Sequence, residues 1–184
     1  MEKRDIRRQV KAYRKALPDE ERMERSQRIC DTILKMPEFL SSNEIFVYMD
    51  CKGEVSTKPL IEEAWRLGKK VAAPKVEGED MIFYYISSFD DVEDGYFHVP
   101  EPVTLKPARE ERALLLVPGV GFALGRNRCG YGQGFYDRYL AAHTEHVTVA
   151  LAFDFQIVDE IAVREEDIRP MMVVTESRLF SDET

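Results

Sequence analysis

The chain has 184 residues, of which 44% are hydrophobic and 33% are charged, with a mean hydropathy of −0.37. This composition is typical of a soluble globular protein, and a chain of this length can bury roughly 70% of the surface that its unfolded form exposes. No apolar run approaches the ~18 residues that a membrane-spanning helix needs. We therefore predict one domain over residues 1–184, with no membrane partner.

The net charge of −8 and the isoelectric point of about 5.1 argue against nucleic acid as a partner. The charge is unevenly distributed, because residues 1–28 contain ten basic and six acidic side chains and the remaining 156 residues carry −12. This basic segment is either a solvated helix face or part of a local anion site. The three cysteines, Cys30, Cys51 and Cys129, form no Cys-x-x-Cys pair and favour a reducing, cytoplasmic location.

Hydrophobic spacing predicts two helices at the start of the chain. The first has one apolar face, made of Ile6, Val10, Tyr13 and Leu17. The second is expected over residues 19–35, after Pro18, and Pro37 is expected to stop it.

Short apolar runs predict six strands, over residues 44–49, 70–75, 81–86, 113–118, 146–153 and 171–175. A helix is expected between the capping residues Ser56 and Thr57 and the terminating Gly68, and another over residues 134–142. Residues 87–112 are rich in proline and are expected to be mostly irregular. Helices alternating with continuously apolar strands predict an α/β fold in three layers, α/β/α, with the sheet between two helix layers.

A glycine-rich loop after the strand at 113–118 carries the strongest chemical signal. Three glycines at alternate positions, Gly130, Gly132 and Gly134, precede a helix, and such loops let backbone N–H groups converge on an anion. Arg128 supplies a planar cation suited to phosphate oxygens, and Asp137 supplies a carboxylate suited to Mg²⁺. The spacing is neither that of a Walker loop nor that of a Rossmann fingerprint. From the residues alone, a phosphate-binding loop and a tight strand-to-helix connection both remain open.

Residues 117–140, VPGVGFALGRNRCGYGQGFYDRYL, resemble the signature of the 5-formyltetrahydrofolate cyclo-ligase family, whose members are also called methenyltetrahydrofolate synthetases. The family pattern is V-P-G and a Phe, followed by R-x-G-x-G-x-G-[YF]-Y-D-R-[YF]-L. Shorter motifs extend the similarity over essentially the whole chain, at residues 3–7, 54–57, 97–102, 152–156 and 174–176. The resemblance implies a fold like that of the NagB, RpiA and CoA-transferase proteins.

The resemblance also implies a reaction, in which Mg²⁺ and ATP drive closure of 5-formyltetrahydrofolate to 5,10-methenyltetrahydrofolate with release of ADP and phosphate. The residues that it assigns to ATP are Lys3, Arg4, Arg7, Arg128, Cys129, Gly130, Tyr131, Gly132, Gln133, Gly134, Phe135 and Tyr136. Those assigned to the folate are Met49, Glu54, Tyr131, Gly132, Gln133, Gly134 and Phe135. Arg128 and Tyr136 are expected to be catalytic, and Asp137 to ligate magnesium. The expected partners are these small molecules, and the chain is expected to be a monomer or weak homodimer.

Several positions depart from the family pattern. Where the family has Phe-Asp-x-x-Gly-x-Arg before the glycine loop, this chain has Ala123 in place of the Asp, and its glycine is displaced to Gly125. Gln133 stands where Gly or Lys is usual, and Met171 stands where an acidic residue often serves magnesium. Because methionine is a poor ligand for Mg²⁺, the metal would be held by Asp137, the ATP phosphates and water.

Two other functions are compatible with the sequence. One is a divergent relative that uses ATP on another formamide or carboxylate. The other is a non-catalytic regulator that binds folate or nucleotide. A phosphosugar isomerase of similar architecture is a weaker third.

Overall fold

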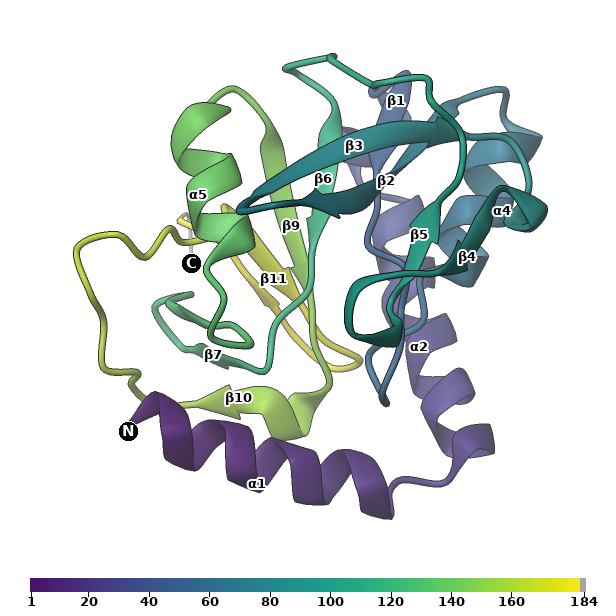
Figure 1. The fold of residues 1–184 in the computed structure, drawn as a ribbon. Coiled ribbons are helices and arrows are strands. Elements are labelled where there is room, and N and C mark those ends of the chain that lie inside the picture. Colours follow the sequence, from purple (N-terminus) through teal and green to yellow (C-terminus); the bar gives the residue numbers. More distant parts are fainter. Residues whose placement is uncertain (183–184) are drawn as a thin grey trace.

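The computed structural model describes residues 1–182 and has a seven-stranded sheet at its centre, in the order β12-β11-β9-β6-β1-β2-β3 (Figure 1). The parallel strands are β1 (Glu44–Phe46), β2 (Lys70–Glu77), β6 (Leu114–Val117), β9 (Val147–Leu151) and β11 (Met172–Val174). The edge strands β3 (Asp80–Ile86) and β12 (Leu179–Phe180) pair antiparallel to their neighbours.

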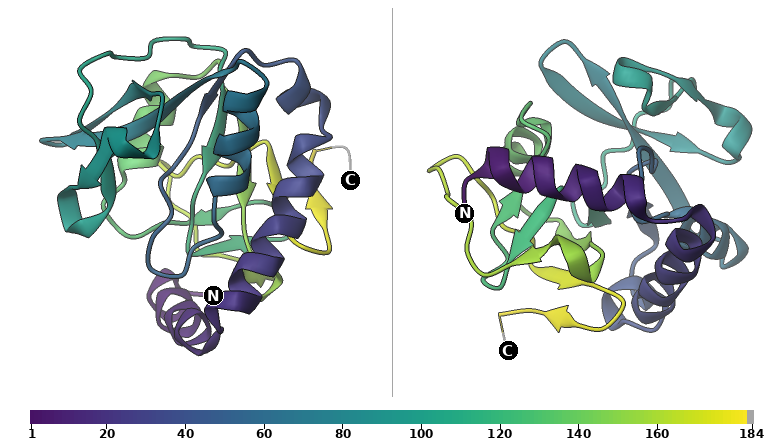
Figure 2. Two further views of the ribbon diagram at one scale, coloured as in Figure 1. Left: turned by 90° about the vertical axis from the view of Figure 1, so that its right-hand side faces the viewer. Right: turned by 90° about the horizontal axis from the view of Figure 1, so that it is seen from below.

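Helices cover both faces of this sheet (Figures 1 and 2). On one face lie α2 (Asp19–Leu34), α3 (Pro37–Leu40) and α4 (Lys58–Arg66), and on the other lies α5 (Phe135–Ala142). All four residues of β6 are buried, because alternate side chains point to opposite faces: Leu114 and Leu116 pack in the cluster with α2 and α4, whereas Leu115 packs in the cluster with α5. The α/β fold predicted from the continuous apolar strands is therefore confirmed.

Helix α1 (Lys3–Ala16) lies outside these layers, across the ends of the strands and beside a small second sheet (Figure 2, right). This sheet has the order β10-β7-β8 and consists of β10 (Ile157–Val158), β7 (Gly121–Ala123) and β8 (Arg128–Cys129). Ile6 and Val10 are buried against it, as their spacing predicts. Tyr13, from the same apolar face, is 48% exposed, and its ring lies 5.3 Å from that of Phe155, between centroids, at the margin of the core.

Some predicted boundaries differ from the structure. Strand β1 ends at Phe46, although the next three residues are also buried. Pro37 is the first residue of α3 instead of only a stop after α2, since proline fits the first turn of a helix. Thr57 precedes α4, but its hydroxyl donates to the Tyr48 carbonyl (2.8 Å) and does not cap the helix. Residues 87–112 contain only the short strands β4 (Val92–Asp94) and β5 (Pro100–Pro102) and two 3₁₀ turns, Phe89–Asp91 and Tyr96–His98. A third 3₁₀ turn, Asp154–Gln156, precedes β10.

The turn between β7 and β8 explains the displaced glycine of the signature. The left-handed position is taken by Arg126, with φ +69°, one residue after Gly125. An L-residue pays about 1–2 kcal/mol for this conformation. Arg126 is 5% exposed and donates to the carbonyls of Pro170 (2.9 Å) and Met171 (2.7 Å) and to the Asp182 carboxylate. These charge-assisted bonds offset the strain.

Within residues 1–182, no helix is both long enough and apolar enough to cross a membrane.

The contact between α1 and β7 depends on a glycine. A Cβ atom at Gly121 would lie 2.5 Å from Ile6 Cγ2, a separation so short that the Ile6 side chain or the backbone on either side must shift. We expect Gly121→Ala to lower the free energy of unfolding by about 1–3 kcal/mol, measured by urea denaturation, because overpacking strains this contact.

Two variants control this prediction. Gly125→Ala should have little effect, because its Cβ would meet only Asn127 Oδ1, at 3.5 Å. Ile6→Ala removes the clashing methyl group, so the double variant with Gly121→Ala should lose less stability than the sum of the two single variants. Strict additivity would show that the clash is not the cause.

Candidate active site

The predicted site residues lie at one edge of the central sheet. β1 and β6 are adjacent and parallel, so the segments that follow them, residues 47–57 and 118–134, leave the sheet at the same edge. In open α/β sheets, ligands bind beyond the carboxyl ends of the strands. Helix α1 runs along this edge and closes the site from below (Figure 1).

The glycine loop connects β8 to α5 through a turn that requires glycine. Gly132 has φ +104°, and Gly134, which directly precedes α5, has φ +71°. At Gly130, a Cβ atom would lie 3.1 Å from the Arg128 guanidinium. The loop therefore passes closely over Arg128 and ends at the unpaired N–H groups of the first turn of α5.

Arg128 is 8% exposed and is fixed beneath this loop. Its Nε donates to the Pro118 carbonyl (2.8 Å), one of its terminal nitrogens lies 3.8 Å from Asp137 Oδ1, and its guanidinium lies 5.3 Å from the centre of the Tyr136 ring. Asp137 Oδ1 also accepts a hydrogen bond from the Ile168 N–H (3.0 Å). The structure thus brings together Arg128, Tyr136 and Asp137, the residues expected to be catalytic and to bind metal.

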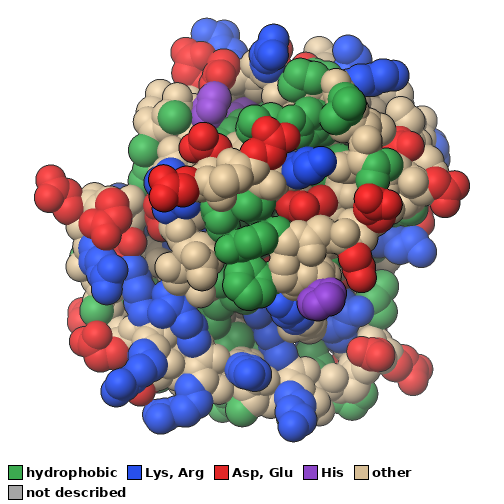
Figure 3. Space-filling model, in the orientation of Figure 1, with side chains coloured by type: hydrophobic (Ala, Val, Ile, Leu, Met, Phe, Trp, Pro, Cys, Tyr) green, Lys and Arg blue, Asp and Glu red, His purple; other side chains and the backbone are tan. Residues whose placement is uncertain are grey.

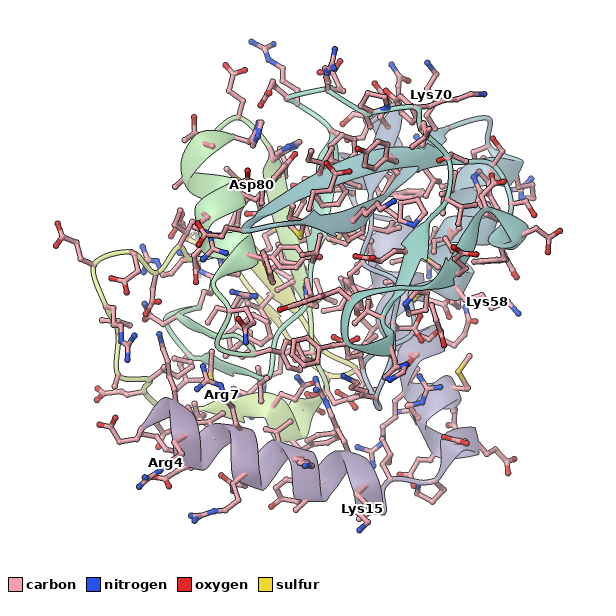
Figure 4. The ribbon with its side chains drawn as sticks, viewed as in Figure 1. Arg4, Arg7, Lys15, Lys58, Lys70 and Asp80 are labelled. Atoms are coloured by element: carbon pink, nitrogen blue, oxygen red, sulfur yellow. The ribbon has the colours of Figure 1, made fainter. Side chains whose placement is uncertain are left out.

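The three N-terminal cations assigned to ATP have different surroundings. Arg7 Nε donates to the Gly130 carbonyl (2.8 Å), so this side chain contacts the glycine loop. Lys3 Nζ is paired with Asp167 Oδ2 at 2.5 Å. Burial acts to raise the pKa of Asp167, but the hydrogen bonds from Lys3 and from the Arg164 N–H, together with the two positive charges, lower it overall. Arg4 is exposed and points away from the loop (Figure 4). Lys and Arg side chains nevertheless gather along the lower part of this face, over α1 (Figure 3).

Glu54 lies across from the loop and is 6% exposed. Its Oε1 accepts a hydrogen bond from the Cys51 N–H (2.9 Å), and its Oε2 accepts one from the Tyr131 hydroxyl (2.8 Å). Burial raises the pKa of Glu54, and the positive charge of Arg14 opposes this effect. The structure thus joins the Glu54 segment to the glycine loop through Tyr131.

Arg14 is a site residue that the sequence reasoning missed. One terminal nitrogen donates to the Tyr131 hydroxyl (2.7 Å) and the other to the Gly119 carbonyl (2.8 Å). The available signal was its spacing, because Arg14 follows Arg7 by seven residues and so lies on the same face of α1, two turns further on.

The remaining predicted residues line the loop or support it. Met49 is 9% exposed and Cys129 is fully buried, so both side chains pack in the core next to the site. Burial raises the pKa of the Cys129 thiol. Gln133 is exposed and its carbonyl accepts a hydrogen bond from Arg138 (2.8 Å). The Phe135 ring lies 6.0 Å from that of Tyr96, between centroids.

The donor set fits a magnesium ion carried by a nucleotide better than a resident metal. Within residues 1–182, no group of three or more His, Cys, Asp or Glu side chains is placed to hold a metal ion. Asp137 offers a single carboxylate beside the loop, and Met171, at 44% exposure, adds no suitable ligand. Mg²⁺ is commonly held by one or two carboxylates together with substrate phosphates and water, which matches this arrangement.

Comparison with known proteins places this chain in a family. A sequence model described as the 5-formyltetrahydrofolate cyclo-ligase family matches residues 1–176. The 5-formyltetrahydrofolate cyclo-ligase of Escherichia coli K12 is 29% identical over 181 residues, covering 93% of this chain and 98% of its own. The mouse protein of the same name is 28% identical over 183 residues, covering 91% and 90%.

A solved structure agrees with this similarity. The NMR structure of Aquifex aeolicus 5,10-methenyltetrahydrofolate synthetase superposes with a TM-score of 0.85 at 32% sequence identity, and the match covers 97% of this chain and 92% of that one. The shared sequence motifs and the shared fold both extend over nearly the whole chain, which therefore belongs to the 5-formyltetrahydrofolate cyclo-ligase family.

Proposed function

We propose that this protein closes 5-formyltetrahydrofolate to 5,10-methenyltetrahydrofolate at the expense of ATP, with release of ADP and phosphate. The observation that carries the proposal is the convergence of Arg7, Arg128 and the glycine loop on one side of the site, with the buried Glu54 on the other. This arrangement supplies a cationic side for phosphates and an acceptor side for a ligand with N–H groups.

The phosphates of ATP are assigned to the basic side. Transfer of a phosphoryl group depends on positioning and on neutralisation of charge, which Arg7, Arg128 and the loop N–H groups supply. Lys3 joins them when it exchanges its partner Asp167 for a phosphate. Asp137 would hold the Mg²⁺ that accompanies the nucleotide, and a bound Mg²⁺ neutralises charge on the phosphate oxygens.

The reaction requires activation of a formamide oxygen, which is a poor leaving group. This oxygen attacks the γ-phosphorus of ATP, ADP leaves, and an N5-iminium phosphate forms. N10 then attacks the former formyl carbon and loses its proton, and phosphate departs with the oxygen. Arg128, held against the ring of Tyr136, lies where it can stabilise the charge of the transferring group. No protein nucleophile takes part.

The folate is assigned to the side of Glu54. Its carboxylate can accept hydrogen bonds from the N–H groups of the bicyclic ring. Tyr131, Phe135 and the buried Met49 border this position. The exposed ring of Tyr96 lies next to Phe135, and the exposed ring of Phe97 lies against Tyr96. Aromatic faces of this kind suit a planar ligand.

Three further assignments belong to the proposal. The protein acts as a single domain over residues 1–184, as a monomer or weak homodimer, and in the cytoplasm. Free thiols at Cys30, Cys51 and Cys129 support a reducing compartment.

The direct test mixes the purified protein with Mg-ATP and 5-formyltetrahydrofolate and follows the absorbance of the methenyl product. We expect product that requires both ATP and Mg²⁺, with loss of the reaction when the metal is chelated. Absence of ATP-dependent product would overturn the proposal. Folate binding without turnover would then favour a regulator, and ATP binding without folate binding would favour a relative that acts on another substrate.

Arg128→Ala should lower kcat/KM at least ~10-fold, because a lost phosphate-positioning charge costs more than about 1.4 kcal/mol of transition-state stabilisation. The measurement is steady-state kinetics on protein whose fold is verified by circular dichroism. Arg112→Ala, which removes an exposed arginine outside the site, is the matched control. Unchanged kinetics in Arg128→Ala would remove Arg128 from the site.

Asp137→Asn should raise the Mg²⁺ concentration needed for half-maximal rate. The asparagine oxygen can still accept the Ile168 N–H, so the change removes the charge and preserves the local hydrogen bond. Activity is measured as a function of Mg²⁺ at saturating ATP, and Asp159→Asn, at an exposed position, is the control. An unaltered metal dependence would exclude Asp137 as a ligand.

A further inference from the structure

Hydrogen bonds link three side chains in series, Arg14 on α1, Tyr131 in the glycine loop and Glu54, and the proposed reaction does not account for this link. Arg14 donates to the Tyr131 hydroxyl (2.7 Å), and that hydroxyl donates to Glu54 Oε2 (2.8 Å). Arg14 is anchored at its other terminal nitrogen by the Gly119 carbonyl (2.8 Å). Its Nε is buried without a hydrogen-bond partner in the described part of the chain, so the guanidinium is held by these two bonds.

The direction of each hydrogen bond in this series is fixed by chemistry. A guanidinium has donors and no acceptor, so the Tyr131 oxygen must accept from Arg14. The single Tyr131 proton is then free to point at Glu54 Oε2, which must accept it. Tyr131 is 48% exposed as a whole, but desolvation of its hydroxyl and the nearby negative charge of Glu54 raise the pKa of Tyr131, and the hydroxyl keeps this proton. On the other oxygen, Oε1, the Cys51 N–H is also a donor. Both oxygens of Glu54 are therefore satisfied as acceptors when the carboxyl is ionised.

The charges around Glu54 show why Arg14 affects the ionisation of this carboxyl. A carboxyl that is 6% exposed favours its neutral form, and burial accordingly raises the pKa of Glu54. The charged and titratable groups that surround this residue are Arg14, Arg22, Tyr48, Asp50, Cys51, Lys52, Tyr131 and Tyr136. The charge of Arg22 is paired with Asp50 at 3.6 Å, and Lys52 lies over the Phe97 ring at 5.8 Å. Arg14, in contrast, donates to two neutral oxygens, which leaves its positive charge to act on Glu54.

We propose that Arg14 is a positioning residue that acts through the Tyr131 hydroxyl to hold Glu54 as a carboxylate whose oxygens only accept hydrogen bonds. This inference rests on the proposed function for the role of Glu54 toward the folate. It gives Arg14 a task that is separate from phosphate binding, although Arg7, on the same face of the same helix, contacts the glycine loop. The site then selects a ligand that presents N–H donors to Glu54 and disfavours one that presents an acceptor.

The test that needs no turnover follows the ionisation of Glu54 by carboxyl ¹³C NMR across a pH titration, with Glu54→Gln identifying the signal. Arg14→Met removes the charge and both donors while keeping a side chain of similar length. We expect the Glu54 titration midpoint to move upward by about 1 pH unit, because the opposing charge is lost. Lys15→Met is the matched control, because Lys15 is exposed and points away from the sheet (Figure 4). An unchanged midpoint in Arg14→Met would overturn the proposal.

A kinetic test separates positioning from general damage. In Arg14→Met the acidic limb of kcat/KM for the folate should move to higher pH, since a higher pKa leaves Glu54 protonated over more of the range, and the KM for Mg-ATP should change little. Arg14→Lys, which keeps the charge, should recover part of the loss. An equal loss at every pH, or a loss confined to the KM for ATP, would contradict the proposal.

Tyr131→Phe provides a second route if Arg14→Met fails to fold. It removes only the hydroxyl that relays between Arg14 and Glu54, and it should move the NMR midpoint in the same direction. An unmoved midpoint here would overturn the role of the relay. Because the NMR titration does not depend on product formation, an inactive wild-type protein would count against the proposed function alone.

Discussion

The contact of α1 with β7 is the constraint on which the site depends. Ile6 lies directly against the backbone at Gly121, and this close approach sets both the height and the rotation of the helix over the strand ends. With the rotation fixed, residues two turns apart face the glycine loop, and so Arg7 reaches the Gly130 carbonyl and Arg14 reaches Tyr131. The buried apolar contact between Ile6 and Gly121 thus fixes the positions of Arg7 and Arg14.

This arrangement explains how an acidic protein can offer a basic site. A net charge of −8 that was spread evenly over the surface would repel a nucleoside triphosphate. Seven of the 26 basic side chains instead lie on α1, and Arg128 adds a positive charge from beneath the loop, where it is nearly excluded from water. Across the site, Glu54 is buried as well, and a buried carboxylate is costly unless donors and an opposite charge accompany it. Tyr131 supplies a hydrogen-bond donor to Glu54, and Arg14 supplies the opposite charge.

The sequence predicted most strands of the central sheet well, because a continuous apolar run bounded by polar turns is typical of a strand that is buried on both faces. Residues 113–118 are an example: burial on both faces leaves no alternation, and β6 has the expected four buried side chains. The small sheet was missed because strands of two or three residues leave no periodicity. The left-handed conformation of Arg126 was missed because the stabilising carbonyls of Pro170 and Met171 are more than forty residues away.

The signature motif predicted which residues lie together in the site. The structure brings four of them to one edge of the sheet: Arg7, Arg128, Tyr136 and Asp137. The individual role of each residue stays a prediction. The pairing of Lys3 with Asp167 left no local pattern, since 164 residues separate the two partners. Arg14 did leave one, the seven-residue spacing from Arg7, but its meaning depends on the position of Tyr131.

The segment before β11 is tied to the site at two points. Asp167 holds Lys3, and the next residue, Ile168, donates its N–H to Asp137. Under the proposed function, Lys3 exchanges Asp167 for a phosphate; Asp167 then keeps its hydrogen bond from the Arg164 N–H (2.8 Å), and the adjacent Ile168 stays attached to Asp137, the carboxylate assigned to magnesium. On that proposal, nucleotide affinity and the attachment of this segment to α1 are linked, because a change that strengthens the Lys3–Asp167 pair weakens binding of the nucleotide, and the coupling is reciprocal.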